Sequence, residues 1–194
     1  MIVLADRNLA LPEAFLFAVE HTLKAEGVFS NHPNDSGGAT LYGIASLKHP
    51  EHYAYIISAN TTEDRIKRAK EVYYLAFWVP SKCNHIESRY LAAEVFDSAV
   101  NMGRYWAGRC AQSAANMMGS SLDPPISLEV DGVIGPVTYR ALNYLSQHYE
   151  LQTLLAMNLF QGMRYVQLYH RDRDKYEVFI RGWMRRLVIP KELL

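Results

Sequence analysis

The chain has 194 residues, of which 49% are hydrophobic and 21% are charged, a balance typical of a folded protein with a substantial core. Its formal net charge of +0 provides no global positive field that would attract nucleic acid, so we expect no nucleic-acid partner. No run of 18 apolar residues occurs, which excludes an ordinary membrane-spanning helix. The apolar run over residues 1–5 is too short for a conventional signal peptide.

The two cysteines and seven histidines show no spacing typical of a metal site. We interpret Cys83 and Cys110 as buried free thiols, because no disulfide framework is evident. We therefore expect no metal and no cofactor.

The first predicted helix spans residues 12–26. Apolar residues recur along it at spacings of three and four, namely Leu16, Val19 and Leu23. The next step along this row is Glu26, and Gly27 then favours a helix end because glycine accepts a left-handed C-terminal cap. Partial burial and the negative end of the helix dipole would both raise the pKa of Glu26. A carboxyl group that stays protonated near neutral pH can act as a general acid, so Glu26 is a candidate catalytic residue.

A segment of turn-forming residues follows, over positions 31–38. It contains a second carboxylate, Asp35, nine positions after Glu26, and Thr40 closes it. Two carboxylates that flank a glycosidic bond are the minimal equipment for its hydrolysis. Turn formation alone would also explain Asp35, and Thr40 could instead cap a following helix.

The order Glu-Gly, then Asn-x-Pro-x-Asp-x-Gly-Gly-x-Thr-x-Tyr-Gly-Ile, ending at Ile44, resembles the signature of the family 108 glycoside hydrolases. These are peptidoglycan muramidases with a lysozyme-like fold, found as phage endolysins and in toxin-secretion loci. The chain departs from the usual pattern at three positions, Val28, Phe29 and His32. The resemblance implies that Glu26 is the general acid. It further implies that Asp35 and Thr40 hold the catalytic water and that Tyr42 binds substrate.

Two helices are predicted in the middle of the chain, over residues 62–79 and 89–103. The first ends in four aromatic residues that we interpret as core, namely Tyr73, Tyr74, Phe77 and Trp78. The second carries four polar residues that share one side, namely Glu94, Asp97, Asn101 and Arg104. A solvated face would explain this row, but the segment 96–103 resembles a second segment of the same family. That resemblance implies that Asp97 and Asn101 face the substrate cleft or brace the catalytic loop.

The C-terminal part, residues 130–194, carries 9 basic and 6 acidic residues, which suits an anionic cell-wall polymer. Further helices are predicted over residues 107–118, 140–145 and 151–169. The last of them carries an apolar row, formed by Leu155, Leu159, Met163 and Val166. The segment from Asp131 to Thr138 resembles an element of small peptidoglycan-binding domains, although an ordinary turn into a helix would also explain it. We expect this part to bind the wall, with Arg140 and Arg164 as candidate contacts.

The predicted fold is mainly α, with a lysozyme-like catalytic domain over residues 1–101 and a helical peptidoglycan-binding-like subdomain over residues 102–194. The activity that the resemblance implies is hydrolysis of the β-1,4 bond between N-acetylmuramic acid and N-acetylglucosamine in peptidoglycan glycan strands. A lytic transglycosylase, a chitinase or a non-catalytic wall-binding protein remains as an alternative. We expect synthesis in the cytoplasm and action in the periplasm or cell wall, after export through a holin or a secretion-locus partner.

Overall fold

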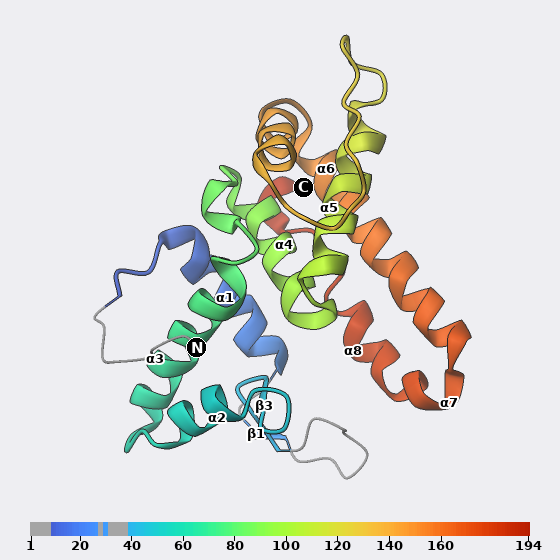
Figure 1. Cartoon of the computed structure of the whole chain (residues 1–194). Helices are drawn as coiled ribbons and strands as arrows, with labels where there is room; N and C mark the ends of the chain where they lie inside the picture. The colour runs from blue at the N-terminus through green and yellow to red at the C-terminus, as the bar shows by residue number, and fades with distance from the viewer. Residues whose placement is uncertain (1–8, 27–28, 31–38) are drawn as a thin grey trace.

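The computed structural model describes residues 9–26, 29–30 and 39–194. The fold is mainly helical, as predicted, with one small sheet (Figure 1). The elements are α1 (Glu13–Glu26), β1 (Phe29–Ser30), β2 (Thr40–Leu41), β3 (Ile44–Ala45), α2 (Pro50–Ile57), α3 (Thr62–Tyr73), α4 (Arg89–Met102), α5 (Arg104–Gly119), α6 (Pro136–Arg171), α7 (Arg173–Tyr176) and α8 (Ile180–Met184). A π-helical segment, Tyr74–Trp78, continues α3, and 3-10 turns occupy Cys83–His85, Glu177–Phe179 and Lys191–Leu193. None of the helices in these ranges is long and apolar enough to cross a membrane.

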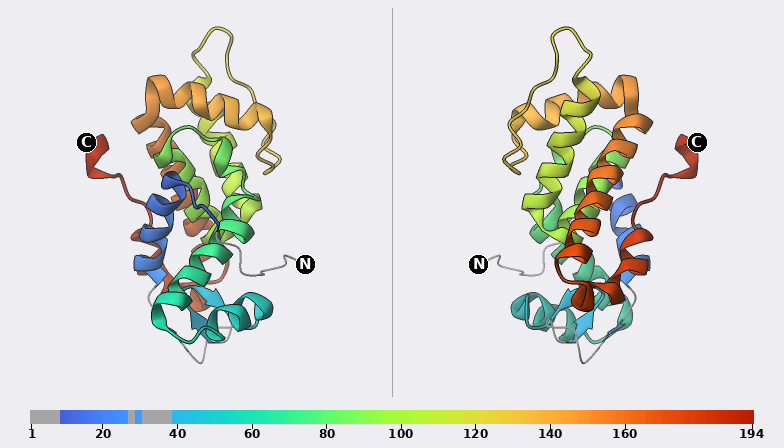
Figure 2. Two further views of the ribbon diagram at one scale, coloured as in Figure 1. Left: turned by 90° about the vertical axis from the view of Figure 1, so that its left-hand side faces the viewer. Right: turned by 90° about the vertical axis from the view of Figure 1, so that its right-hand side faces the viewer.

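The sheet and α2 lie at one end of the molecule, and the segment 120–135 with the first half of α6 lies at the other (Figure 2). The second half of α6 returns towards the sheet end, where α7 and α8 follow it (Figure 2). One cluster of buried residues extends through both parts of the chain, from Phe15 of α1 to Met157 of α6. The division into domains at residue 101 stays a prediction.

Helix α1 packs against α4 through an apolar face that the sequence dictates. Its buried residues follow a spacing of three and four, namely Phe15, Ala18, Val19 and Thr22. The facing residues of α4 are buried at the same spacing, namely Leu91, Ala92, Val95, Phe96 and Ala99. Helix α4 begins where Ser88 accepts a hydrogen bond from the Leu91 amide at 3.1 Å, a typical N-terminal cap.

Aromatic side chains close the core between α1, α3 and α4. The ring of Phe15 meets those of Trp78 and Phe96 edge to face, at 5.4 and 5.8 Å between ring centres. Tyr73 and Trp78 are 0% and 1% exposed, which confirms that this part of the aromatic group is core. The two free cysteines, Cys83 and Cys110, are also buried, as predicted.

Helix α5 lies against the loop that precedes α6, and a buried glutamine of α5 forms hydrogen bonds with that loop. The amide of Gln112 donates to the Asp131 carboxylate at 2.7 Å, and its carbonyl oxygen accepts from the Gly132 amide at 2.8 Å. Gln112 also lies 3.4 Å from the Thr138 hydroxyl. The polar groups of Asp131, Gly132 and Thr138 therefore contact α5. These contacts explain the residues of this segment by their role in the turn that precedes α6.

Helix α6 consists of two helical halves that meet at a non-helical residue, Tyr149 (φ −144°, ψ 41°), between the two helices predicted over residues 140–145 and 151–169. The prediction that an apolar row lines the buried side of this helix was wrong. The four residues of that row are 47–51% exposed, namely Leu155, Leu159, Met163 and Val166. The buried row is formed instead by Leu154, Met157, Gln161 and Tyr165, of which the last two carry polar groups. Packing against α4, α5 and the C-terminal segment thus decides which side of α6 is buried.

Replacement of Gly108 by alanine should destabilise the fold. A Cβ atom at this position of α5 would lie 2.1 Å from the carbonyl oxygen of Gly132. Overpacking of this kind costs about 1–3 kcal/mol, so thermal denaturation should show a melting temperature several degrees lower. Gly182→Ala in α8 is the matched control, because no described atom lies within 4 Å of its added Cβ. Equal melting temperatures for both variants would contradict the close approach of α5 and the loop.

Candidate functional site

The predicted general acid, Glu26, is the last residue of α1. It follows Thr22 by one helical turn, and Thr22 is buried in the α1 face that packs on α4. Burial of Phe15 and Val19 fixes the axis of this helix and hence the position of its end. The side chain of Glu26 lies outside the described part of the structure, so its role stays a prediction.

The small antiparallel sheet limits the distance between Thr40 and the end of α1. Ser30 pairs with Thr40, and Thr40 pairs with Ala45, in the order β1-β2-β3. Ser30 follows Glu26 by four positions, so their Cα atoms lie at most about 14 Å apart, and paired strands add about 5 Å. The backbone of Thr40 thus lies within about 20 Å of Glu26. Asp35 belongs to residues 31–38, which lie outside the described residues.

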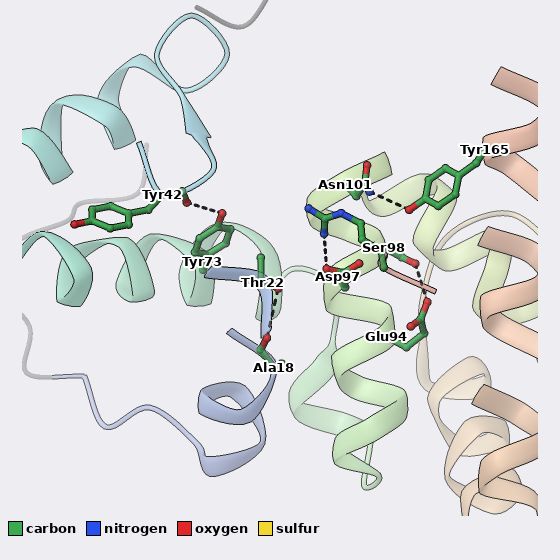
Figure 3. A network of polar contacts seen from close by, with 10 residues as sticks. Ala18, Thr22, Tyr42, Tyr73, Glu94, Asp97, Ser98, Asn101 and Tyr165 are labelled. Atoms are coloured by element: carbon green, nitrogen blue, oxygen red, sulfur yellow. Dashed lines mark hydrogen bonds and ion pairs between the residues drawn. The ribbon is translucent and has the colours of Figure 1, made fainter. Parts of the chain in front are cut away.

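Tyr42 forms the tight turn between β2 and β3. Tyr42 and Gly43 both have positive φ, 48° and 80°, as the turn of a two-residue hairpin requires. The Tyr73 hydroxyl donates to the Tyr42 carbonyl at 2.8 Å, and Tyr42 is 5% exposed. Figure 3 shows the Tyr42 ring directed away from α4. The observed contacts of Tyr42 support the hairpin, and its contact with substrate stays a prediction.

The polar row on α4 points into the protein rather than into solvent, because three of its members meet partners from other elements or from α4 itself (Figure 3). Asp97 accepts from the Arg186 guanidinium at 2.5 Å, across 89 positions of sequence. The Asn101 amide donates to the Tyr165 hydroxyl of α6 at 2.9 Å. Glu94 is 7% exposed and accepts a hydrogen bond of 3.4 Å from Ser98. These contacts join α4 to the C-terminal part of the chain, and roles of Asp97 and Asn101 in substrate binding stay predictions.

Burial sets the protonation of the two acids in this row. It raises the pKa of Glu94 to about 8, and the nearby Asp97 charge adds to the rise. Burial also raises the pKa of Asp97, against the attraction of Arg186. Near neutral pH, Glu94 is therefore mostly protonated.

A cavity of about 100 Å³ lies between α1, α4 and the segment that follows α8. Its polar lining includes His21, Thr22, Glu94, Asp97 and Arg186. Among the described residues, no group of three or more His, Cys, Asp or Glu side chains is arranged to hold a metal ion.

Sequence reasoning did not find the partners of α4. Arg186 and Tyr165 are separated from α4 by tens of residues, and the sequence offers no local signal that would join them. One feature of the sequence could have predicted the burial of Glu94. It lies three positions from Asp97 on a helix whose other residues are largely apolar.

Both parts of the chain match models of known protein families. Residues 19–103 match the family model described as glycosyl hydrolase 108, and residues 109–188 match a predicted peptidoglycan domain. The solved structure of Brucella abortus SagA is similar in fold, with a TM-score of 0.63, 22% sequence identity, and coverage of 89% of this chain and 88% of SagA. A comparison with curated proteins found no significant match.

These findings define a glycoside hydrolase with a lysozyme-like domain followed by a helical peptidoglycan-binding domain. Residues 19–103 are similar to the glycosyl hydrolase 108 family, and the second match supports peptidoglycan as the substrate. A holin or secretion-locus partner, and the place of action, stay predictions.

The stability of the protein should depend on the protonation of Glu94. Its pKa is about 8 in the folded state against 4.5 as the ordinary value, so unfolding between pH 5 and 8 releases a proton. The free energy of unfolding should therefore fall as the pH rises through this window, by at most about 1.4 kcal/mol per pH unit. Glu94→Gln should flatten that dependence in denaturant titrations, because glutamine cannot ionise.

Glu20→Gln, which removes an exposed acid from α1, is the control and should retain the wild-type pH dependence. Identical pH dependence of Glu94→Gln and the wild type would show that Glu94 is ionised in the folded protein.

Proposed function

We propose that the protein is an N-acetylmuramidase that hydrolyses the β-1,4 bond between N-acetylmuramic acid and N-acetylglucosamine. The observation that carries the proposal is the position of Glu26 at the end of the buried α1, in a chain whose residues 19–103 match glycosyl hydrolase 108. The short sheet supports it, because the pairing of Thr40 with Ser30 limits the distance between the Thr40 backbone and that helix end to about 20 Å.

In this proposal, the Glu26 carboxyl group donates its proton to the glycosidic oxygen as the bond between that oxygen and the anomeric carbon breaks. A water molecule held by Asp35 and Thr40 forms the new bond to the anomeric carbon, and its proton passes to the Asp35 carboxylate. Direct attack by water inverts the anomeric configuration. The two carboxyl groups must then stand about 6.5–9.5 Å apart, against about 5–5.5 Å for a retaining pair.

A transglycosylase would use the same acid without a catalytic water, and its products would carry anhydro ends. Mass spectrometry of the fragments released from purified sacculi distinguishes the two reactions, because hydrolysis leaves reducing ends with one added water. Anhydro products in place of reducing ends would overturn hydrolysis.

Glu26→Gln should lose most wall-lytic activity, because glutamine keeps the shape of the side chain but cannot deliver the proton. Loss of general acid catalysis costs ~10²–10⁴-fold in rate. Release of soluble fragments from sacculi measures this effect. Glu20→Gln on the same helix is the control, and near wild-type lysis by a folded Glu26→Gln variant would refute the assignment.

Asp35→Asn should reduce the rate without trapping a glycosyl-enzyme, because the proposed role of Asp35 is to hold water rather than to attack the sugar. Proton NMR of the first product from the wild type should show the α-anomer. An initial β-anomer, or a covalent adduct on Asp35 in mass spectra of the protein, would establish retention and remove the water-holding role of Thr40.

A further inference from the structure

Arginine and aromatic side chains form two neighbouring groups, one between α5 and α6 and one between α6 and α7. The Arg164 guanidinium lies 3.8 Å from the ring centre of Trp106, and the Arg109 guanidinium lies 5.7 Å from the same ring. At the far end of α6, Arg171 donates to the Tyr176 hydroxyl at 2.8 Å. We call the two groups together the arginine–aromatic cluster; its members are Tyr105, Trp106, Arg109, Arg164, Arg171 and Tyr176.

The positive charge of the cluster is not neutralised by the described part of the chain. No described carboxylate lies within the 4.0 Å of an ion pair from its three arginines; the ion pairs found there join Arg173 to Glu177 and Arg186 to Asp97. The neighbouring acid Asp172 instead caps α7, by accepting from the Lys175 amide.

Arg164 stacks on Trp106, but its Nε atom lacks a hydrogen-bond acceptor among the described residues. The Nε atom is also buried. Burial and then the positive charge of Arg171 lower the pKa of Arg164. A bound anion would both accept from Arg164 and relieve its repulsion from Arg171.

The cluster is open to a ligand. Tyr105 is 54% exposed and offers a flat ring face, and the side chain of Arg171 is exposed. Figure 2 shows α5 and the second half of α6 side by side, with α7 at the same end of the molecule as the sheet. A polymer bound at the cluster can therefore extend towards the hairpin that carries Thr40.

We propose that the arginine–aromatic cluster binds the free carboxylates of the peptide stems of peptidoglycan. The inference rests on the proposed function only in taking peptidoglycan as the polymer. Peptide stems carry carboxylates, whereas the glycan backbone between them is uncharged. A guanidinium group binds a carboxylate through two parallel hydrogen bonds, and the stacking of Arg164 on Trp106 holds that group in a fixed orientation. Tyr105 adds an aromatic face on which a sugar ring can pack.

The test measures pelleting of the full chain with purified sacculi, with every protein carrying Glu26→Gln so that cleavage does not alter the sacculi. Arg164→Gln and Arg171→Gln should each bind at least about tenfold more weakly and show a smaller dependence on salt. Arg65→Gln is the matched control. Arg65 belongs to α3, outside the C-terminal part, and donates to the Ala59 carbonyl at 3.1 Å, so binding by this variant should not change.

A second arm changes the sacculi. Conversion of their carboxylates to amides should weaken binding of the parent protein as much as Arg171→Gln does, and peptide-free glycan strands should bind as weakly. Undiminished binding to amidated sacculi, or unchanged binding by both arginine variants, would overturn the inference.

Thermal denaturation identifies an Arg164→Gln variant that fails to fold, and in that case the exposed Arg171 decides the outcome. The proposed function is tested separately, by loss of lysis in Glu26→Gln alone. Lysis therefore tests the proposed function, and pelleting with sacculi tests the proposed binding site, so either proposal can fail without the other.

Discussion

The ion pair between Asp97 and Arg186 is the contact on which the arrangement of the two parts depends. It joins the middle of α4 to the segment after α8, and its two side chains are 20% and 10% exposed. Removing charges from water is costly, and pairing repays that cost only while both partners are present. The C-terminal segment is therefore held in one place on α4, because any displacement would leave two buried charges without partners.

Helix α4 thus supports both functions of the chain. One side packs against α1, whose end carries Glu26, and the polar row meets Tyr165 of α6 and Arg186. Tyr165 in turn stacks on Trp183 of α8, with ring centres 4.9 Å apart. The proposed acid and the proposed wall-binding surface are consequently fixed to a single helix, so a glycan strand gripped by one part is presented at a constant distance from the other.

The sequence predicted features that arise locally and missed those that arise from packing. The end of α1 at Glu26 follows from helical spacing and the adjacent glycine, both of which are local. The strands have two residues each, too few to show an alternating pattern, so the sequence alone does not predict the hairpin. On α6 the more apolar row is exposed, because Gln161 and Tyr165 belong to the side that packs inward.

The residues of the candidate site likewise fall into those that a local motif identified and those whose partners are distant in sequence. Glu26, Asp35 and Thr40 were identified through a motif that spans 15 positions, from Glu26 to Thr40. The partners of Asp97 and Asn101 lie 89 and 64 positions away, a separation at which helical periodicity carries no information. Their contacts with the C-terminal part became evident only from the fold.

The turn at Tyr42 has a consequence for the stability of the hairpin. A left-handed backbone is unfavourable for tyrosine, and strands of two residues contribute few hydrogen bonds to offset that cost. The hydroxyl group that stabilises this turn comes from Tyr73, 31 positions later in the chain. The hairpin therefore depends on the docking of α3 for part of its stability, and a change that loosens α3 should also loosen this turn.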